Sequence, residues 1–224
     1  MKVEIWSDVM CPFCYIGKRK FERALEKFSA KEHVEIEWKS FQLNPDMKTD
    51  PTKNVNQFLA EHKGIPFSRA KQMNDRVTAM AQEVGLQYDF DKAIVANSFD
   101  AHRLSHFAKS HGKQDAMEER LFKAYFTEGK NTADHETLIG IAVEVGLNGD
   151  EVRAVLSGTE YTEAVNNDID QAHRIGVHGV PFFVFNNTYA VSGAQPAEVF
   201  LQVLEKIYDE QRSSELTDTN RTQS

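Results

Sequence analysis

The first 43 residues carry the hydrophobic pattern of a strand, a helix and a second strand. The opening segment KVEIWSD is rich in β-branched and aromatic residues, as strands are. Apolar residues then recur at helical spacing, at Ile16, Phe21, Leu25 and Phe28. The segment HVEIEWKSFQL alternates between apolar and charged positions, which predicts a half-buried strand with its charged side chains in water. Together these segments predict a β-α-β unit.

Helical periodicity replaces the strand patterns from residue 44 to about residue 167. Six segments with helical spacing follow one another, and each closes on a glycine, which suits the left-handed conformation that ends many helices. These glycines are Gly64, Gly85, Gly112, Gly129, Gly146 and Gly158. We therefore expect an all-helical insertion here and not a second α/β domain.

Strand patterns return near the end of the chain. In GVPFFVFNNTYAVSG two apolar runs flank Asn186 and Asn187, a pair that favours a hairpin turn. The segment QPAEVFLQVLEKIYDEQ has the apolar stripe of an amphipathic helix. The order β-α-β, helical block, α-β-β-α predicts an α/β, thioredoxin-like fold with a large helical insertion. We expect a discontinuous thioredoxin-like domain at residues 1–43 and 168–212, an insertion subdomain at 44–167 and a disordered tail at 213–224.

Composition narrows the classes of partner and compartment. The chain has 224 residues and a net charge of −8, which disfavours nucleic acid and an anionic membrane surface as partners. No run approaches the ~20 apolar residues that a transmembrane helix needs. The first residues lack the apolar stretch of a signal peptide, so we expect a cytoplasmic protein.

The only two cysteines, Cys11 and Cys14, stand where the first strand gives way to the first helix. A thiol attacks a disulfide as its thiolate, and a helix N-terminus favours an anion. Cys11 is predicted at the helix N-cap, followed by Pro12, which suits the first turn of a helix. Cys14 comes about one turn later. We therefore predict that Cys11 attacks a disulfide and that Cys14 resolves the resulting mixed disulfide.

Other interpretations of the two cysteines are weaker. A structural zinc site needs four ligands, C-x-x-C supplies two, and Pro12 between them disfavours a zinc knuckle. A static disulfide would close a short, strained loop and is rare in the cytoplasm. Inert core cysteines do not account for a Cys-Pro-x-Cys motif between a strand and a helix. We expect no metal.

The residues around the cysteines refine this hypothesis. Phe13 offers the thiolate no side-chain hydrogen-bond donor, so we expect a less oxidising pair than one with histidine at this position. Asp8 precedes Cys11 by three residues and is expected in solvent at the end of the strand; turned inward, it would disfavour a thiolate and assist deprotonation of Cys14. Pro181 in GVHGVPFF fits the first residue of a strand, as a cis or a trans proline.

Three segments together resemble the DsbA-like thioredoxin superfamily, and specifically its cytoplasmic FrnE-type branch. They are DVMCPFCYIGKR, NSFDAHRLSHFAK and GVHGVPFFVFNNTYAVSGAQP, and the resemblance extends from Val3 to about Tyr208. It implies a thiol–disulfide oxidoreductase with oxidase or isomerase character. Cys11 would be the nucleophile and Cys14 the resolving thiol.

The resemblance also implies residues that bind substrate. Pro12 and Phe13 would contact it, although this branch often has tryptophan at the second position. Val180 and Pro181 would form the cis-proline loop, whose backbone pairs with the substrate. The family likeness places three residues of the insertion near the active-site groove, where they would orient substrate or glutathione: Asn97, His102 and Arg103. The alternative is that His102 and Arg103 cap and bridge helices.

The leading hypothesis is a cytoplasmic dithiol–disulfide oxidoreductase without metal or bound organic cofactor. Its partners would be proteins or low-molecular-weight thiols and disulfides, with glutathione as a redox partner. One alternative is a glutathione-dependent enzyme like the kappa-class transferases and the 2-hydroxychromene-2-carboxylate isomerases, which share this architecture. Another is a redox-sensing, chaperone-like binding module.

Overall fold

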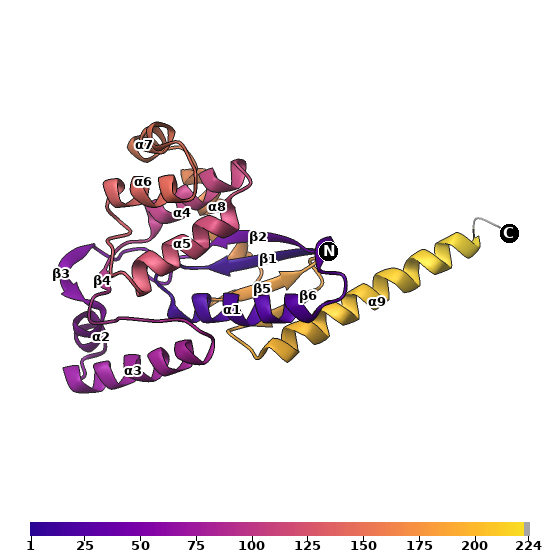
Figure 1. Cartoon of the computed structure of the whole chain (residues 1–224), viewed down its shortest axis with the longest axis horizontal. Coiled ribbons are helices and arrows are strands. Elements are labelled where there is room, and N and C mark those ends of the chain that lie inside the picture. The colour runs from indigo at the N-terminus through magenta and orange to yellow at the C-terminus, as the bar shows by residue number, and fades with distance from the viewer. Residues whose placement is uncertain (222–224) are drawn as a thin grey trace.

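A computed structural model describes the backbone of residues 1–221 and the side chains of residues 1–213 (Figure 1). Its central sheet has the order β2-β1-β5-β6, and these strands come from both ends of the chain. Strand β1 pairs in parallel with β2 and antiparallel with β5, which pairs antiparallel with β6. The α/β, thioredoxin-like fold predicted from the sequence is confirmed. The bounds are β1 Lys2–Ser7, α1 Pro12–Lys27, β2 Glu35–Ser40, β5 Phe182–Phe185, β6 Tyr189–Ser192 and α9 Ala197–Arg221.

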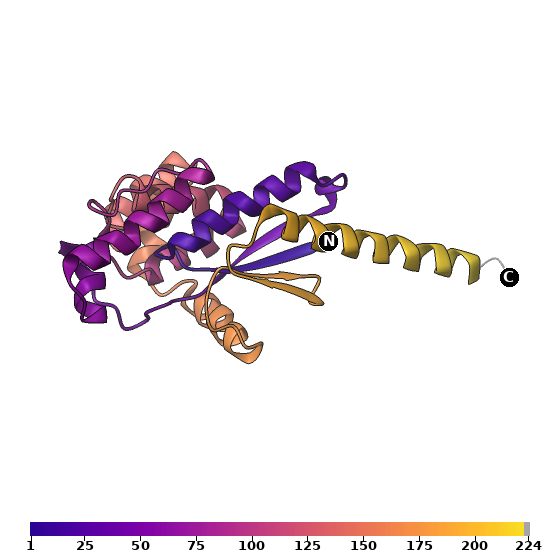
Figure 2. The same ribbon diagram turned by 90° about the horizontal axis from the view of Figure 1, so that it is seen from below.

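Helices α1 and α9 cover one face of the sheet, as Figure 2 shows. Phe21 of α1 is buried between sheet and helix, with its ring centroid 5.5 Å from that of Phe183 on β5 and 5.6 Å from that of Phe200 on α9. Burying an aromatic side chain of this kind contributes roughly 1.5–3 kcal/mol. The core on this face therefore fixes α1, and with it the position of the two cysteines at its start.

Helix α8 (Thr162–Arg174) packs on the opposite face of the sheet (Figure 2). Trp6 of β1 is fully buried there, in an apolar cluster with Phe41 and Ala172. Its indole N–H donates to the backbone carbonyl of Asp168 at 3.0 Å. The expected domain boundary at residue 168 falls inside this continuous helix, and the division into two domains stays a prediction.

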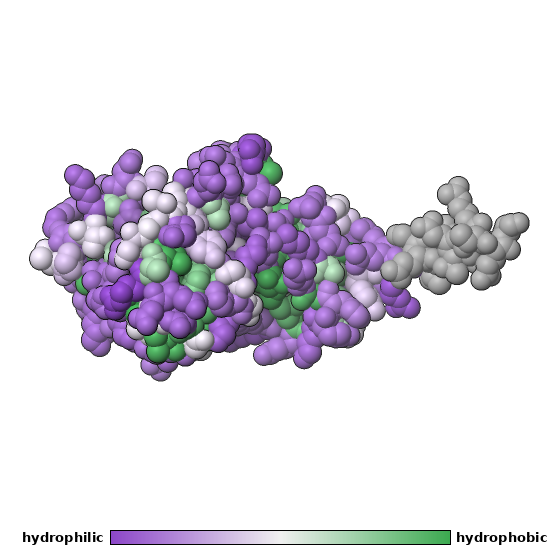
Figure 3. All heavy atoms as spheres, turned by 90° about the horizontal axis from the view of Figure 1, so that it is seen from above, coloured by the Kyte–Doolittle hydropathy of each residue, from purple (hydrophilic) through white to green (hydrophobic). Residues whose placement is uncertain are grey.

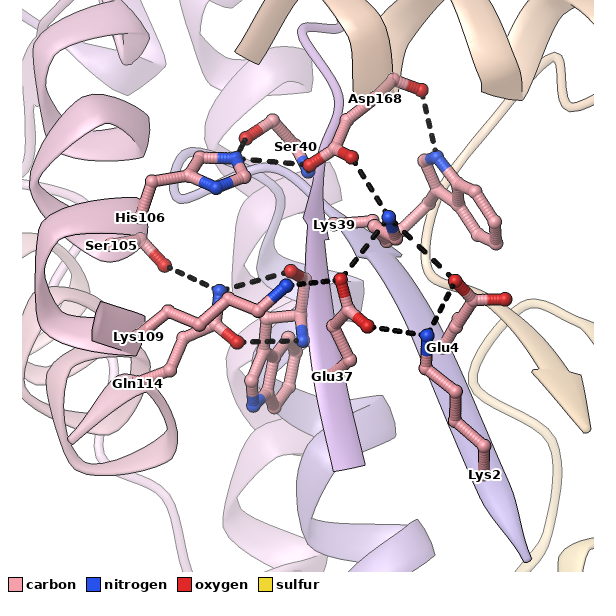
Figure 4. A network of polar contacts seen from close by, with 12 residues as sticks. Lys2, Glu4, Glu37, Lys39, Ser40, Ser105, His106, Lys109, Gln114 and Asp168 are labelled. Atoms are coloured by element: carbon pink, nitrogen blue, oxygen red, sulfur yellow. Dashed lines mark hydrogen bonds and ion pairs between the residues drawn. The ribbon is translucent and has the colours of Figure 1, made fainter. Parts of the chain in front are cut away.

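A buried ionic network covers the charged side of β2 (Figure 4). The Lys39 ammonium lies 3.1 Å from Asp168 Oδ1 and 3.2 Å from Glu37 Oε1. Burial raises the pKa of Glu37, but Lys109, Lys2 and Lys39 outweigh it and lower the pKa to about 2. The expectation that this side of β2 faces water holds for the exposed Glu35 and is wrong for Glu37 and Lys39. Helices α4 and α8 cover these two side chains with groups of opposite charge.

The insertion lies beyond the end of the sheet at which α1 begins (Figure 1). Its further helices are α2 Val55–Lys63, α3 Phe67–Glu83, α4 Phe99–Ser110, α5 Gln114–Phe126, α6 His135–Glu144 and α7 Gly149–Ser157. The insertion is not wholly helical, because β3 (Asp50–Asn54) pairs antiparallel with β4 (Ile94–Val95). The sequence of β3, DPTKN, has low strand propensity, so its pattern carries no strand signal.

The predicted glycine caps are confirmed for five of the six segments. Gly64, Gly85, Gly112, Gly129 and Gly146 all have positive φ. Gly158 differs, with φ −100° at the end of α7. A side chain from another helix supplies the cap at that position, as described below.

The C-terminal elements confirm the predicted hairpin and correct the predicted tail. Asn186 and Asn187 have φ of 47° and 54° and form the turn between β5 and β6. Helix α9 continues to Arg221, where a disordered tail from residue 213 was expected, because extending a formed helix costs far less than nucleating one. The remainder of that expectation, residues 222–224, lies outside the described residues.

Among the helices that the structure describes, none has the length and apolar character of a membrane span. The face in Figure 3 is mostly hydrophilic, with a few apolar patches.

Candidate active site

Cys11 stands at the N-cap of α1, as predicted. Its backbone is extended, with φ −87° and ψ 112°, and Pro12 occupies the first helical position. The Cys11 amide donates to the Asp8 carbonyl at 2.9 Å, which closes the turn between β1 and α1. We call residues 8–11 the redox turn. The thiol of Cys11 therefore lies at the positive end of the helix dipole, where an anion is stabilised.

Cys14 lies one turn further along α1, behind Cys11. Both thiols are free, and Cys11 and Cys14 are 3% and 1% exposed. Burial, and then the neighbouring Cys11 thiol, raises the pKa of Cys14 well above its ordinary range, while Ser7 and the Asp8 backbone act in the opposite direction. A shielded thiol that resists ionisation suits a second, intramolecular step better than a first attack on substrate.

The loop before β5 faces the cysteines. The Val180–Pro181 peptide bond is cis, and the Cys11 thiol donates to the Val180 carbonyl at 3.4 Å. Gly17 of α1 permits this approach, because a Cβ built on Gly17 would lie 2.8 Å from Pro181 Cγ. The structure thus brings together Cys11, Cys14 and the predicted proline loop.

Tyr88 connects the insertion to the first turn of α1. Its hydroxyl donates to the Pro12 carbonyl at 2.7 Å, and its ring is buried against Phe126 of α5. Burial, and next the charge at Cys11 and Cys14, raises the pKa of the Tyr88 hydroxyl, which therefore remains a donor. The insertion thus holds the backbone between the two cysteines in place.

An apolar groove of about 420 Å³ opens beside the two residues that separate the cysteines. Phe13 is 38% exposed and forms one wall together with Pro12, so the side chains predicted to meet substrate do line a cavity. The other lining residues come from the loop after β2, from α2, α3, α5 and from the segment around β4. They include Leu43, Met47, Phe58, Leu59, Met73, Val77, Phe90 and Val95. No lysine or arginine is among the residues that line it. A groove of this size and character suits an uncharged, apolar group.

Asp8 is completely buried, which overturns the expectation that it lies in solvent. Its carboxylate accepts the amides of Leu43 at 2.8 Å and Met10 at 3.3 Å, and lies 3.6 Å from His102 Nε2 of α4. Two amides and a histidine replace the water that a carboxylate at a strand end would otherwise need. Burial lowers the pKa of His102, but Asp8 and other carboxylates outweigh it, so the pKa is raised. His102 therefore contacts the redox turn and does not line the groove.

Asn97 orders the loop after β2. Its side chain donates to the Met47 carbonyl at 2.9 Å and accepts the Phe99 amide at 2.9 Å at the start of α4. It also accepts from Gln42 at 3.2 Å. Asn97 thus supports Met47, a wall of the groove, without lining it. The structure gives Asn97 an indirect role at the groove, and its contact with substrate stays a prediction.

Arg103 caps the C-terminus of α7. Its guanidinium is buried and donates to the carbonyls of Val155, Gly158 and Glu160, and to Asp100 at 2.8 Å. These bonds satisfy the carbonyls that a glycine in the left-handed conformation satisfies elsewhere. The donors of Arg103 are thus directed at backbone carbonyls and at Asp100, as in the alternative that Arg103 caps and bridges helices, and the substrate contact implied by the resemblance stays a prediction.

A family model described as the DSBA-like thioredoxin domain matches residues 2–205. The chain belongs to this family. It is 40% identical to a probable DsbA oxidoreductase from Streptomyces coelicolor, whose crystal structure superposes with a TM-score of 0.89 over 94% of this chain and 91% of that one. It is also 28% identical to the uncharacterized protein YwbO of Bacillus subtilis, over 94% of this chain and 97% of that protein.

More distant structures share the fold of this DsbA-like chain. The cytosolic disulfide reductase DsbM of Pseudomonas aeruginosa is 16% identical, with a TM-score of 0.65 over 93% of this chain and 99% of that one. At this identity the likeness concerns architecture. The residues that the structure describes contain no cluster of three or more His, Cys, Asp and Glu side chains that could hold a metal ion.

Sequence reasoning missed Gly17, Tyr88 and the groove. The sequence could have indicated the role of Gly17, because a glycine inside a helical pattern often marks a site of close packing. No sequence pattern indicated the contact of Tyr88 with α1 or the position of the groove. Their side chains come from helices and loops far apart in sequence, and only the packing of the insertion against α1 brings them together.

Proposed function

We propose that this DsbA-like protein is a thiol–disulfide oxidoreductase in which Cys11 attacks and Cys14 resolves. The observation that carries the proposal is the position of the Cys11 thiol, at the N-cap of α1 and 3.4 Å from the Val180 carbonyl. The shielded second thiol one turn behind it supports the assignment of roles. Membership of a family of disulfide oxidoreductases and isomerases agrees with it.

The reaction proceeds through a mixed disulfide. The Cys11 thiolate attacks one sulfur of a substrate disulfide, the substrate S–S bond breaks, and the leaving sulfur departs as a thiolate that takes up a proton. Cys14 then loses its proton and attacks Cys11, which releases the second substrate thiol. The enzyme pair loses two electrons and the substrate gains two. Run in reverse, the same steps oxidise a dithiol. If another thiolate of the substrate attacks the mixed disulfide before Cys14 does, a new substrate disulfide forms, Cys11 leaves as a thiolate, and the substrate has been isomerised.

Disulfides of proteins or small thiols are the proposed substrates, and the groove supports those flanked by apolar groups. Pro12 and Phe13 form its wall, so a group attached near the attacked sulfur would lie in it. Met47 and Met73 offer flexible, polarizable contacts that suit varied side chains. Glutathione would act as a redox partner in solution and not as a bound cofactor.

The second candidate is a glutathione-dependent isomerase or transferase. A 2-hydroxychromene-2-carboxylate isomerase shares the fold at 16% identity and a TM-score of 0.62, and a structure of DsbM is described with glutathione. Glutathione carries two carboxylates, and the absence of lysine and arginine from the groove lining disfavours holding it there. The free resolving thiol Cys14 also favours the oxidoreductase.

Trapping the mixed disulfide tests the proposal. A Cys14→Ser variant, given a peptide disulfide with apolar flanking residues, should accumulate a covalent adduct at Cys11, and a Cys11→Ser variant should form none. Turnover should fall by at least ~10³-fold in both variants, as when a catalytic nucleophile is removed. Glutathione-dependent turnover that survives in Cys14→Ser would instead support the transferase.

A further inference from the structure

Asp8 and His102 form a buried acid–base pair directly behind the redox turn. Asp8 is fully buried and His102 is 2% exposed. His102 Nε2 lies 3.6 Å from Asp8 Oδ1, and no described residue offers this nitrogen a hydrogen bond. A buried imidazole nitrogen without a partner is costly, whereas a protonated ring facing a carboxylate is stabilised. The geometry therefore favours a protonated His102 that faces the Asp8 carboxylate.

The other charged groups that face His102 leave this pair intact. Glu118 approaches from α5, is buried and accepts a hydrogen bond from Ser105 at 2.5 Å, while its second oxygen has no described partner. Burial raises the pKa of Glu118, which disfavours a negative charge there, although His102 and Ser105 act in the opposite direction. Asp168 approaches from α8 but is already held by Lys39 and His106. Asp8 is thus the carboxylate left to balance a proton on His102.

The pair is joined to the sulfurs by a short path. The Asp8 carboxylate accepts the amide of Met10, and the Asp8 carbonyl accepts the amide of Cys11. The Cys14 thiol lies against Ser7 and the backbone of Asp8. Displacing Asp8 would therefore move the start of α1. The protein interior also screens charges far less than water does, so a charge at His102 would act on a charge at the sulfurs.

We propose that Asp8 and His102 are positioning residues of the redox site, and that the proton on His102 is coupled to the oxidation state of Cys11 and Cys14. This inference rests on the proposed redox function. A thiolate in the reduced pair favours a protonated His102, and forming the disulfide removes that negative charge. Because coupling between two sites is reciprocal, a proton on His102 must in turn favour the thiolate.

The direct test is titration of the His102 ring by NMR in the reduced and the oxidised full-length protein. Oxidation should lower the pKa of His102 by about 0.7 units, which is the fivefold coupling at the low end for protein sites. His135, which pairs with Asp100 on the protein surface and is 43% exposed, serves as the control and should titrate alike in both states. An unchanged His102 pKa would overturn the inference.

Substitution gives a second test. His102→Gln should destabilise the thiolate and shift the redox equilibrium at least about fivefold toward the disulfide, with His135→Gln unchanged. If Asp8 and His102 act as a unit, adding Asp8→Asn to His102→Gln should shift the equilibrium little further. If these variants fail to fold, the NMR titration of His102 in the unaltered protein still tests the proposed coupling. Mass spectrometry of the cysteines separates failure of the proposed function from failure of this inference. A cysteine pair that never forms a disulfide contradicts the proposed function. A disulfide that forms without changing the pKa of His102 contradicts only this inference.

Discussion

At the residue scale, a few side chains around Cys11 build the proposed redox site on a common fold. The thiol takes its position from the helix N-cap, from the Val180 carbonyl and from the turn that begins at Asp8. Gly17 makes this arrangement possible, because any larger residue at that position would push Pro181 away from the thiols.

Gly17→Ala should therefore lower both stability and activity. The added Cβ, 2.8 Å from Pro181 Cγ, should cost about 1–3 kcal/mol by overpacking, which exceeds the gain of about 1 kcal/mol in helix propensity. Chemical denaturation and the rate of disulfide exchange measure the two effects. The matched control is Gly140→Ala in α6, where nothing lies within 4 Å, and it should stabilise the protein by up to about 1 kcal/mol. Equal effects of the two substitutions would contradict this role for Gly17.

Residues near the cysteines in sequence were predictable from local rules, and Asp8 was not. Cys11, Pro12 and Cys14 obey the chemistry of a helix start, which depends on neighbours along the chain. The burial of Asp8 depends on His102 and on the loop that contains Leu43. The sequence around Asp8 does not indicate contacts with residues so far away in the chain.

At the scale of elements, hydrophobic periodicity predicted the strands and helices that have a core face. It could not reveal β3, whose polar residues pair through the backbone alone. It placed the end of α7 correctly at Gly158, but the glycine does not have the left-handed conformation that was expected of it. Arg103 from α4 provides the cap, and its long-range contacts were not visible in the sequence.

Arg103→Met should accordingly destabilise the protein without changing its redox chemistry. Losing the buried guanidinium removes the side-chain donors of the carbonyls at the end of α7, and we expect a loss of about 2–4 kcal/mol in the free energy of unfolding. The redox equilibrium should stay unchanged, because Arg103 does not line the groove. Arg153→Met, which removes an exposed arginine of α7, should change stability by no more than about 0.5 kcal/mol. A weaker affinity for substrate with unchanged stability would support the role that the family resemblance implied.

At the scale of the whole molecule, the insertion and α8 are joined to the sheet through buried charges as well as apolar contacts (Figure 4). Asp168 is the centre of this junction. Its carboxylate meets Lys39 from β2, His106 from α4 and the amide of Ser40 at 3.0 Å. The alternation of apolar and charged residues in β2 predicted which side chains share a face. It did not predict that α8, more than a hundred residues later in the chain, would cover part of the charged face.

Asp168→Asn should cost about 3 kcal/mol at pH 7, because it leaves Lys39 and His106 without their shared carboxylate. Burial raises the pKa of Asp168, but His106, Ser40 and Lys39 outweigh it, so the pKa lies below its ordinary value of 3.8. A lowered pKa contributes stability above pH 3.8 that disappears as the pH falls through the lowered value. The difference between the two proteins should therefore hold from pH 7 to pH 5 and shrink below pH 3.8, as measured by urea unfolding.

The control for this prediction is Asp75→Asn, since Asp75 forms an exposed pair with Lys71 on α3. It should change the free energy of unfolding by no more than about 1 kcal/mol. A deficit for Asp168→Asn that persists unchanged below pH 3 would show that the carboxylate charge is not what joins the insertion to the sheet.

The redox equilibrium of the Cys11–Cys14 pair against a glutathione buffer tests the central claim most directly. Thiol trapping and mass spectrometry would follow the two cysteines across the range of buffer potentials. The account predicts a reversible two-electron couple, with Cys11 alkylated before Cys14 in the reduced protein. A pair that never oxidises, or a reduced protein in which Cys14 reacts first, would contradict it.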